Sequence, residues 1–311
     1  MQHITDLKQI VRPFPNAVVT IGNFDGVHIG HQALFGQVIE KAKQLDGTAV
    51  VVSFAPHPIR VLKCDKHFPL ITLYEQKVEL IAATGVDVLV CIPFTLEFAD
   101  IAARRFVKEI LVDTIGMKAV IVGPDYSFGK KREGNIELLK EMGGYLGFEV
   151  NIADWVEAGP RRISSTEIRN LVMAGEVEAA SILLGRYYQI RGTVRRGRDR
   201  GGKLLGYPTA NLSLEDELCP KAGVYAVTVE YEGKRYQGVA NIGDSPTFEN
   251  GQYNLEVHIL DFHESIYGKP IRVNFVKRLR GETRFPSPQA LSDQIREDTQ
   301  QARKVLSDRQ Q

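Results

Sequence analysis

The chain has 311 residues, of which 43% are hydrophobic and 25% charged, a composition typical of a folded protein long enough for two domains. With 39 basic and 38 acidic residues, the formal net charge of +1 lacks the basic excess of nonspecific nucleic-acid binders. The three cysteines, Cys64, Cys91 and Cys219, stand far apart without a CxxC pair, which argues against a disulfide framework or a zinc knuckle. The N-terminus lacks a signal-peptide core and no apolar run reaches membrane-spanning length, so we expect a cytoplasmic protein without a membrane partner.

In the first half, short β-branched runs alternate with helical patterns. Strands are expected at Ala17–Phe24, Thr48–Ala55, Asp87–Phe94 and Ala119–Gly123, and they lack the polar alternation of half-exposed strands. Helices are expected between them, at His31–Leu45, Leu73–Thr84 and Ala99–Thr114. This order predicts an α/β domain with a parallel sheet and helices on its faces.

The pattern changes near residue 185. Two short helices are expected at 164–174 and 176–184, and Gly185 would end the second. From Tyr188 onward the runs are β-type, and Glu232-Gly233 marks a hairpin between 224–231 and 234–242; further strands are expected at 255–262 and 271–279. A final amphipathic helix is expected at 288–306. The sequence therefore predicts a mainly antiparallel barrel or sandwich closed by a helix, with domains at 1–184 and 185–311.

The run GNFDGVHIGH, residues 22–31, leaves the first predicted strand and enters the first helix. Ligands bind at this place in open parallel sheets, and glycines there let a phosphate approach the backbone. His28 and His31 project to one side of the helix start, where two imidazoles would neutralise charge on a phosphoryl centre. The alternative is that one histidine caps the helix and the other packs. A zinc site is disfavoured, because neither an intervening Glu nor a nearby Cys completes it.

The run ISSTEIR, residues 163–169, has two interpretations. Ser164 and Glu167 have the spacing of an ordinary capping box. Alternatively, the hydroxyls, the helix-start amides and Arg169 form a second phosphate cradle.

Together these two runs resemble the HxGH nucleotidyltransferase superfamily and, more narrowly, the N-terminal domain of the prokaryotic bifunctional riboflavin kinase/FMN adenylyltransferases, also called FAD synthetases. The resemblance implies a Rossmann-like domain in which His28 and His31 bind the ATP phosphates and stabilise the transition state. It also implies an ATP and phosphate site formed by Gly22, Phe24, Asp25, Gly30, Ser164, Ser165, Thr166 and Arg169.

Two further blocks, FAPHP at 54–58 and GPDYSFGKKREG at 123–134, are similar to the same family. They imply a nucleotide or flavin pocket lined by Asn23, His57, Asp125 and Phe128. On chemistry alone, His57 is equally a surface loop residue and Phe128 a loop anchor.

In the second half, LGYPTANL at 205–212 places Thr209 and Asn211 on one side, and their oxygens suit Mg²⁺. A turn with an asparagine that stabilises its own backbone is the alternative. In LEVHILDF at 255–262, Glu256 and His258 share one face. Glu256 is either a solvated carboxylate or a general base for a hydroxyl that attacks ATP.

PTAN, GVYAV at 223–227, GVANIGDSPTF at 238–248 and LEVHILDF, in this order, resemble the riboflavin kinase domain, so the resemblance covers nearly the whole chain. It implies a six-stranded barrel with Glu256 as the catalytic base. It also implies an ATP site at Gly206, Pro208, Thr209 and Asn211, with Mg²⁺ at Thr209 and Asn211. Arg278 and Arg280 either touch flavin or phosphate or form a charged strand end.

The loop at 195–206 departs from the family pattern. Gly202-Lys203 stands where the family usually has a glycine-arginine pair, and lysine lacks the bidentate fork of arginine. We expect this change to alter the tuning of the kinase and not its identity.

The predicted function is phosphorylation of riboflavin by ATP to give FMN, followed by transfer of AMP from ATP to FMN to give FAD and pyrophosphate. The expected partners are the small molecules ATP, riboflavin and FMN, with no nucleic acid. The alternatives are a single-function enzyme with one silent site, a different HxGH transferase, and a non-catalytic flavin-binding regulator.

Overall fold

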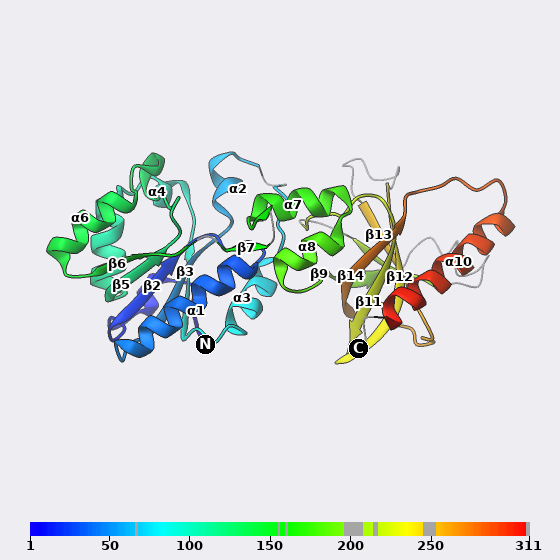
Figure 1. Cartoon of the computed structure of the whole chain (residues 1–311), viewed down its shortest axis with the longest axis horizontal. Helices are drawn as coiled ribbons and strands as arrows, with labels where there is room; N and C mark the ends of the chain where they lie inside the picture. The colour runs from blue at the N-terminus through cyan, green and yellow to red at the C-terminus, as the bar shows by residue number, and fades with distance from the viewer. Residues whose placement is uncertain are drawn as a thin grey trace. The chain divides into compact units, whose positions relative to one another are not determined.

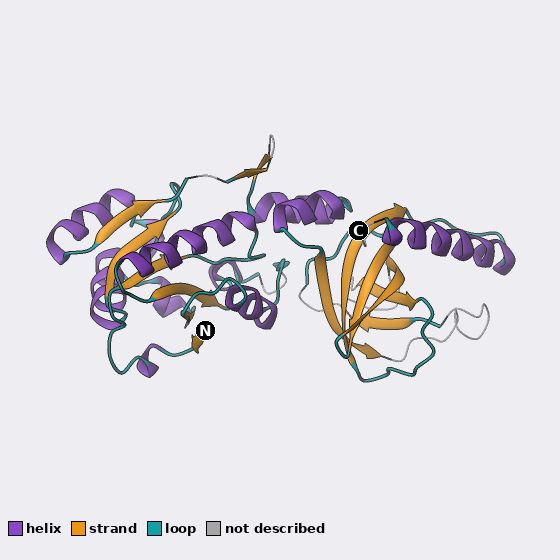
Figure 2. Cartoon of the chain, turned by 60° about the horizontal axis from the view of Figure 1, so that its bottom comes forward, coloured by secondary structure: helices purple, strands orange, loops and turns teal. Residues whose placement is uncertain are grey.

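The computed structural model describes residues 1–65, 68–154, 156–158, 161–195, 208–213, 217–244 and 253–308. They form two compact units, Met1–Ser165 and Thr166–Gln311. The sequence analysis placed the domain boundary later, after residue 184, so that the two helices before it group here with the second unit. Figure 2 shows the contrast between the units, because helices and strands alternate in one and strands predominate in the other.

The first unit contains a six-stranded parallel sheet in the order β1-β4-β3-β2-β5-β6. The four predicted strands are confirmed, and β1 and β6 are two short strands that the sequence analysis missed. Both lie at sheet edges and are half exposed, so they lack a continuous apolar run. The bounds are Gln2–Ile4 (β1), Ala17–Ile21 (β2), Ala49–Ala55 (β3), Val88–Pro93 (β4), Met117–Val122 (β5) and Glu149–Ile152 (β6).

Alternate residues of the strands pack against helices on the two faces of the sheet (Figure 1). One face is covered by α1 (Ile29–Gln44) and α3 (Tyr74–Ala82), and the other by α6 (Ile136–Leu146) and a π-type helix, η2 (Phe106–Thr114). Smaller elements complete the unit: η1 (Leu7–Gln9), α2 (Pro58–Leu62), α4 (Leu96–Ala99), α5 (Ala103–Arg105), η3 (Lys130–Arg132), β7 (Glu157–Ala158) and β8 (Arg161–Arg162).

The prediction of one continuous helix at Ala99–Thr114 was wrong. The amide of Asp100 donates to Leu96 O at 3.1 Å and closes α4. After α5 the helix widens, and the amide of Ile115 bonds Ile110 O, five residues back, at 2.9 Å. Apolar spacing alone does not distinguish such π-type turns from an α-helix.

The second unit is a closed antiparallel barrel in the order β10-β13-β12-β11-β14-β9 (Figure 1). Because β10 pairs with both β13 and β9, the sheet closes on itself, which decides for the barrel over the sandwich. The predicted hairpin is confirmed, with positive φ at Glu232 and Gly233. The bounds are Tyr188–Arg195 (β9), Ala210–Ser213 (β10), Gly223–Tyr231 (β11), Lys234–Asp244 (β12), Tyr253–Ile259 (β13) and Pro270–Arg280 (β14).

Helices cover parts of the barrel's outer surface. The chain reaches the barrel through α7 (Ser165–Ala174) and α8 (Val177–Leu184), and α10 (Pro288–Ser307) follows the last strand. Ala302 and Leu306 of α10 pack against Ala226 and Val276 of the barrel. Throughout the described part of the chain, no helix has the length and apolar character needed to cross a bilayer.

Candidate active sites

In the first unit, three of the predicted blocks follow strand ends at one edge of the sheet. Residues 22–28 follow β2, 56–57 follow β3, and 123–134 follow β5. Because β3 and β5 flank β2, the strand order reverses beside β2, and in open parallel sheets this switch point is where ligands bind. The fold therefore brings blocks about a hundred residues apart in sequence to the same edge.

His28 caps α1 with its side chain. The His31 amide donates to His28 Nδ1 at 3.3 Å. A backbone N–H donates only to an unprotonated ring nitrogen, so this bond fixes the neutral tautomer that carries its proton on Nε2. The capping interpretation and the phosphate interpretation of His28 are therefore compatible. Gly30 leaves room for this ring, since a Cβ at this position would make a tight contact of 3.2 Å with His28 Nδ1.

The ring of His31 is held between two aromatic neighbours. It stacks on His28 with ring centroids 3.5 Å apart, and it meets Phe24 edge-on at 5.1 Å. Phe24 is itself buried against Phe35. The side chain of Phe24 therefore packs between Phe35 and His31.

The loop before His28 has an unusual backbone. Phe24 and Val27 have positive φ angles of 50° and 41°, which are rare for residues with a side chain, above all for β-branched valine. The buried carboxylate of Asp25 accepts hydrogen bonds from the amides of Ile71 and Thr72, both at 3.1 Å. Asp25 therefore anchors the loop from inside.

The start of α7 is attached to the same loop. Ser165 Oγ donates to the carbonyl of Asp25 at 2.9 Å. Ser164 and Ser165 lie at the end of the first unit, and Thr166 and Arg169 continue along α7 in the second. Thr166 is exposed and Arg169 is partly exposed.

The remaining pocket residues of this site differ in burial. His57 caps α2 by accepting the Ile59 amide at Nδ1, 3.3 Å away, and stacks on Phe68. Asp125 is exposed in the loop after β5. Phe128 is buried in the core and pairs with Gly134, which agrees with its interpretation as a loop anchor.

In the second unit, the barrel register brings the key residues together. Asn211 on β10 and Asn241 on β12 are the direct cross-strand partners of Glu256 on β13. Asn254 Nδ2 donates to Asn211 Oδ1 and to Glu256 Oε1, both at 3.2 Å. Burial raises the pKa of Glu256, and the Asn254 hydrogen bond partly opposes this.

Glu256 opens onto a cavity of about 760 Å³ between the barrel surface, α10 and the segment that precedes it. Much of its lining is apolar: Val224 and Val239 come from the barrel, and Phe285, Leu291 and Ile295 from α10 and the segment before it. His258, on the same face as Glu256, bonds the carbonyl of Pro208 through Nδ1 at 2.8 Å.

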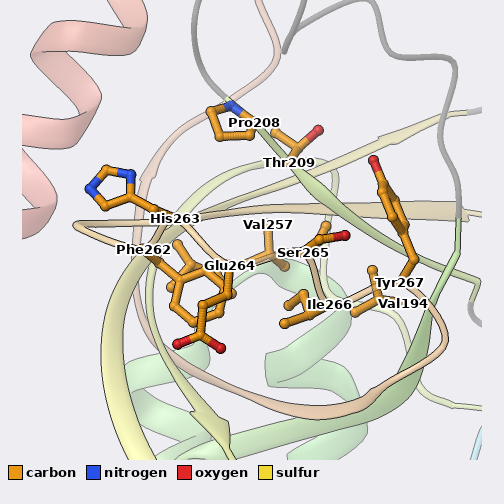
Figure 3. A pocket seen from close by; sticks show the side chains of 12 residues that line it. Val194, Pro208, Thr209, Val257, Phe262, His263, Glu264, Ser265, Ile266 and Tyr267 are labelled. Atoms are coloured by element: carbon orange, nitrogen blue, oxygen red, sulfur yellow. The ribbon is translucent and has the colours of Figure 1, made fainter.

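A second cavity of about 350 Å³ lies where the interior-facing residues of the barrel reach its end. Figure 3 shows Pro208 and Thr209 on one side of it and residues 262–267 around the rest. Val257 and Ile259 of β13 face this cavity, whereas Glu256 and His258 face the larger one. Thr209 lines both cavities.

The two arginines near the end of β14 differ in their contacts. Arg278 donates to Ala222 O at 2.7 Å. Arg280 forms a bidentate ion pair with the buried carboxylate of Asp298 on α10, at 2.8 Å, and its guanidinium lies over Phe285. Arg280 is the one that borders the large cavity.

Some predicted residues lie outside the described part of the chain. They are Gly206, most of the arginine-rich loop at 195–206, and the end of GVANIGDSPTF. Sequence analysis missed Asn254, although it stands two residues before Glu256 on the same strand face.

The comparisons with known proteins identify the family of each half of the chain. The chain matches the FAD synthetase family over residues 12–167 and the riboflavin kinase family over residues 184–306. Proteins named bifunctional riboflavin kinase/FMN adenylyltransferase from Listeria monocytogenes and Escherichia coli K12 are 41% and 38% identical to it. The alignments cover 93% and 94% of this chain and 92% and 94% of those proteins.

A crystal structure from Streptococcus pneumoniae, titled a macrolide-efflux protein, superposes with a TM-score of 0.87 at 34% identity and covers 97% of this chain and 98% of that one. The fold and the two family matches thus define a two-domain flavin nucleotide transferase. The chain belongs to the bifunctional riboflavin kinase/FMN adenylyltransferase family.

Proposed function

We propose that the chain converts riboflavin to FMN in its barrel and FMN to FAD in its parallel-sheet domain, with ATP as the donor in both steps. The observation that carries the first step is that Glu256 lines a cavity of flavin size and has Asn211 as its direct partner on the adjacent strand. We assign adenylyl transfer to residues 1–184, since two of the predicted phosphate ligands for this step, Thr166 and Arg169, stand on α7.

In the barrel, the larger cavity takes riboflavin and the smaller one takes the ATP nucleotide. The apolar wall of the large cavity suits a flavin ring, and Glu256 at its border accepts the proton of the ribityl hydroxyl. That oxygen then bonds the γ-phosphorus while the bond to the β-phosphate breaks, which gives FMN and ADP. A raised pKa makes Glu256 a stronger base than an exposed carboxylate.

Thr209 and Asn211 are the residues that would hold Mg²⁺ in the kinase. Thr209 directly precedes β10, and Asn211 on β10 lies opposite Glu256 on β13. A hydroxyl, an amide oxygen and a carboxylate are hard oxygen donors that fit this cation. When bound, Mg²⁺ neutralises charge on the transferred phosphates. Thr209 borders both cavities, which is the position needed between flavin and nucleotide.

In the parallel-sheet domain, the phosphate of FMN attacks the α-phosphorus of ATP directly. A P–O bond forms to the FMN phosphate, the bond to the β-phosphate breaks, and pyrophosphate leaves. His28, with its proton on Nε2, donates to the phosphate oxygens, and the amides at the start of α1 face the same charge. His31, Ser164, Thr166 and Arg169 contribute further donors, and His57 and Asp125 line the pocket for the nucleotide or the flavin.

Both reactions belong in the cytoplasm on this proposal. Each consumes ATP, and the chain's three cysteines suit a reducing compartment. Neither step requires a nucleic acid or a membrane.

The test is a time course of the purified full chain with riboflavin, ATP and Mg²⁺, followed by separation of the flavins. FMN should rise first and then give way to FAD. FMN alone would leave a kinase with a silent first site. Unchanged riboflavin, beside a working control enzyme, would support the flavin-binding regulator.

A further inference from the structure

We propose that Lys77 is a positioning residue for adenylyl transfer, joining the loop that carries His28 to the loop that carries His57. Lys77 lies on α3 and is buried, with 8% of its surface exposed. Its ammonium donates to Asn23 O at 3.3 Å, to Ser53 Oγ at 3.0 Å and to Phe54 O at 3.1 Å. All three protons of the ammonium are therefore used on oxygens at the ends of β2 and β3.

The position of these three oxygens connects Lys77 to the site. Asn23 stands two residues after β2, in the loop that leads to His28, and Phe54 stands three residues before His57. Ser53 Oγ in turn donates to Asn23 O at 3.2 Å, so the side chain between the two strands belongs to the same network. One buried charge thus fixes the spacing of two loops that leave neighbouring strands.

The first of these loops needs external support. The positive φ angles of Phe24 and Val27 are unfavourable, and such conformations persist only where the surroundings over-determine them. Besides the Ser165 hydrogen bond to the Asp25 carbonyl, contacts with the segment at 71–77 provide this support. Asp25 is held by the amides of Ile71 and Thr72, and Asn23 by Lys77.

Burial of a lysine in a core carries a large desolvation penalty. Burial lowers the pKa of Lys77, and the neighbouring Cys91 and Asp25 oppose this. A methionine of similar length would fill the same space without desolvation of a charge. A methionine could not donate hydrogen bonds to the carbonyls of Asn23 and Phe54. The inference rests on this difference and on the adenylyl-transfer function proposed above.

The experiment compares Lys77→Met with Ile81→Val in the full chain. Ile81 is buried on the same helix and touches neither loop through a hydrogen bond, so Ile81→Val serves as the matched core change. Conversion of supplied FMN gives kcat and KM for adenylyl transfer. The assay temperature is kept well below the thermal unfolding midpoint of each variant. Phosphorylation of riboflavin by the same preparation reports on the unaltered barrel.

Lys77→Met should lower kcat for adenylyl transfer by about 10²-fold, the loss typical of an ångström-scale misplacement, with phosphorylation and the control variant unchanged. If Lys77→Met does not fold, Ser53→Ala, which removes one of the three acceptors, should lower the same kcat several-fold. Full adenylyl transfer in the folded variant, or parallel loss of both activities, would overturn the positioning role. No FMN conversion by the unaltered chain would instead overturn the proposed function, and the inference with it.

Discussion

The two sites of this chain are built in different ways. In the barrel, Asn211 and Glu256 are direct partners on adjacent strands, so the hydrogen-bonded ladder itself sets their spacing. In the parallel-sheet domain, His28 follows a loop with unfavourable backbone angles, and that loop is held by a main-chain amide and a lysine side chain from elsewhere in the chain. One site is positioned by secondary structure and the other by tertiary contacts.

This difference has a consequence for mutation. Substitution of residues that never touch substrate should lower adenylyl transfer more than phosphorylation. The loop that precedes His28 has no strand pairing that would restore its conformation. In the barrel, remote changes should act mainly on the cavity wall or on the pKa of Glu256. Four substitutions separate these effects.

The largest effect is expected from Glu256→Gln. The amide keeps the size of the side chain and cannot accept the hydroxyl proton, so kcat for riboflavin phosphorylation should fall by about 10²–10⁴-fold. Conversion of supplied FMN to FAD should be unchanged in the same preparation. Retained phosphorylation would show that Glu256 is not the base.

Substitution of His28 separates its proposed role in adenylyl transfer from its role as the N-cap of α1. Asparagine is a good N-cap, so His28→Asn should keep the stability of α1, which thermal unfolding measures. It lacks the imidazole donor, and adenylyl transfer should fall by about 10²–10³-fold. Full activity in a stable His28→Asn chain would reduce His28 to a helix cap.

Arg280→Met should weaken the wall of the flavin cavity. It leaves the Asp298 carboxylate buried without its guanidinium partner, which should cost about 3 kcal/mol of barrel stability. The KM for riboflavin should rise more than kcat falls, because α10 borders the cavity. The double change Arg280→Met with Asp298→Leu should recover most of the stability; if it does not, the ion pair is not the cause.

The smallest effect is a shift in pH dependence. The Asn254 amide favours the ionised form of Glu256, so Asn254→Ala should raise the pKa of that carboxyl further. Because the base acts when ionised, phosphorylation should then be lost at a higher pH as the solution is acidified. The effect is expected to be small, because only one hydrogen bond is lost. An unmoved acid limb would contradict this coupling.

The sequence was sufficient for the two-domain architecture and for most of its strands and helices. Buried β-branched runs predicted the central strands, Glu232-Gly233 predicted the hairpin, and alternation placed Glu256 and His258 on one face. The supporting contacts were not predictable, because they join distant segments. Lys77 and Asn23, which are hydrogen-bonded, are 54 residues apart in sequence. Asp298 stands on a polar helix, and only the structure shows that it is paired with Arg280.

The most direct test of two separate sites in one chain uses Glu256→Gln and His28→Asn together. Supplied with riboflavin and ATP, the first should make neither FMN nor FAD, and the second should stop at FMN. Mixed in one tube, they should form FAD, since each supplies the step that the other lacks. FAD from either variant alone, or a mixture that accumulates FMN without forming FAD, would contradict the account.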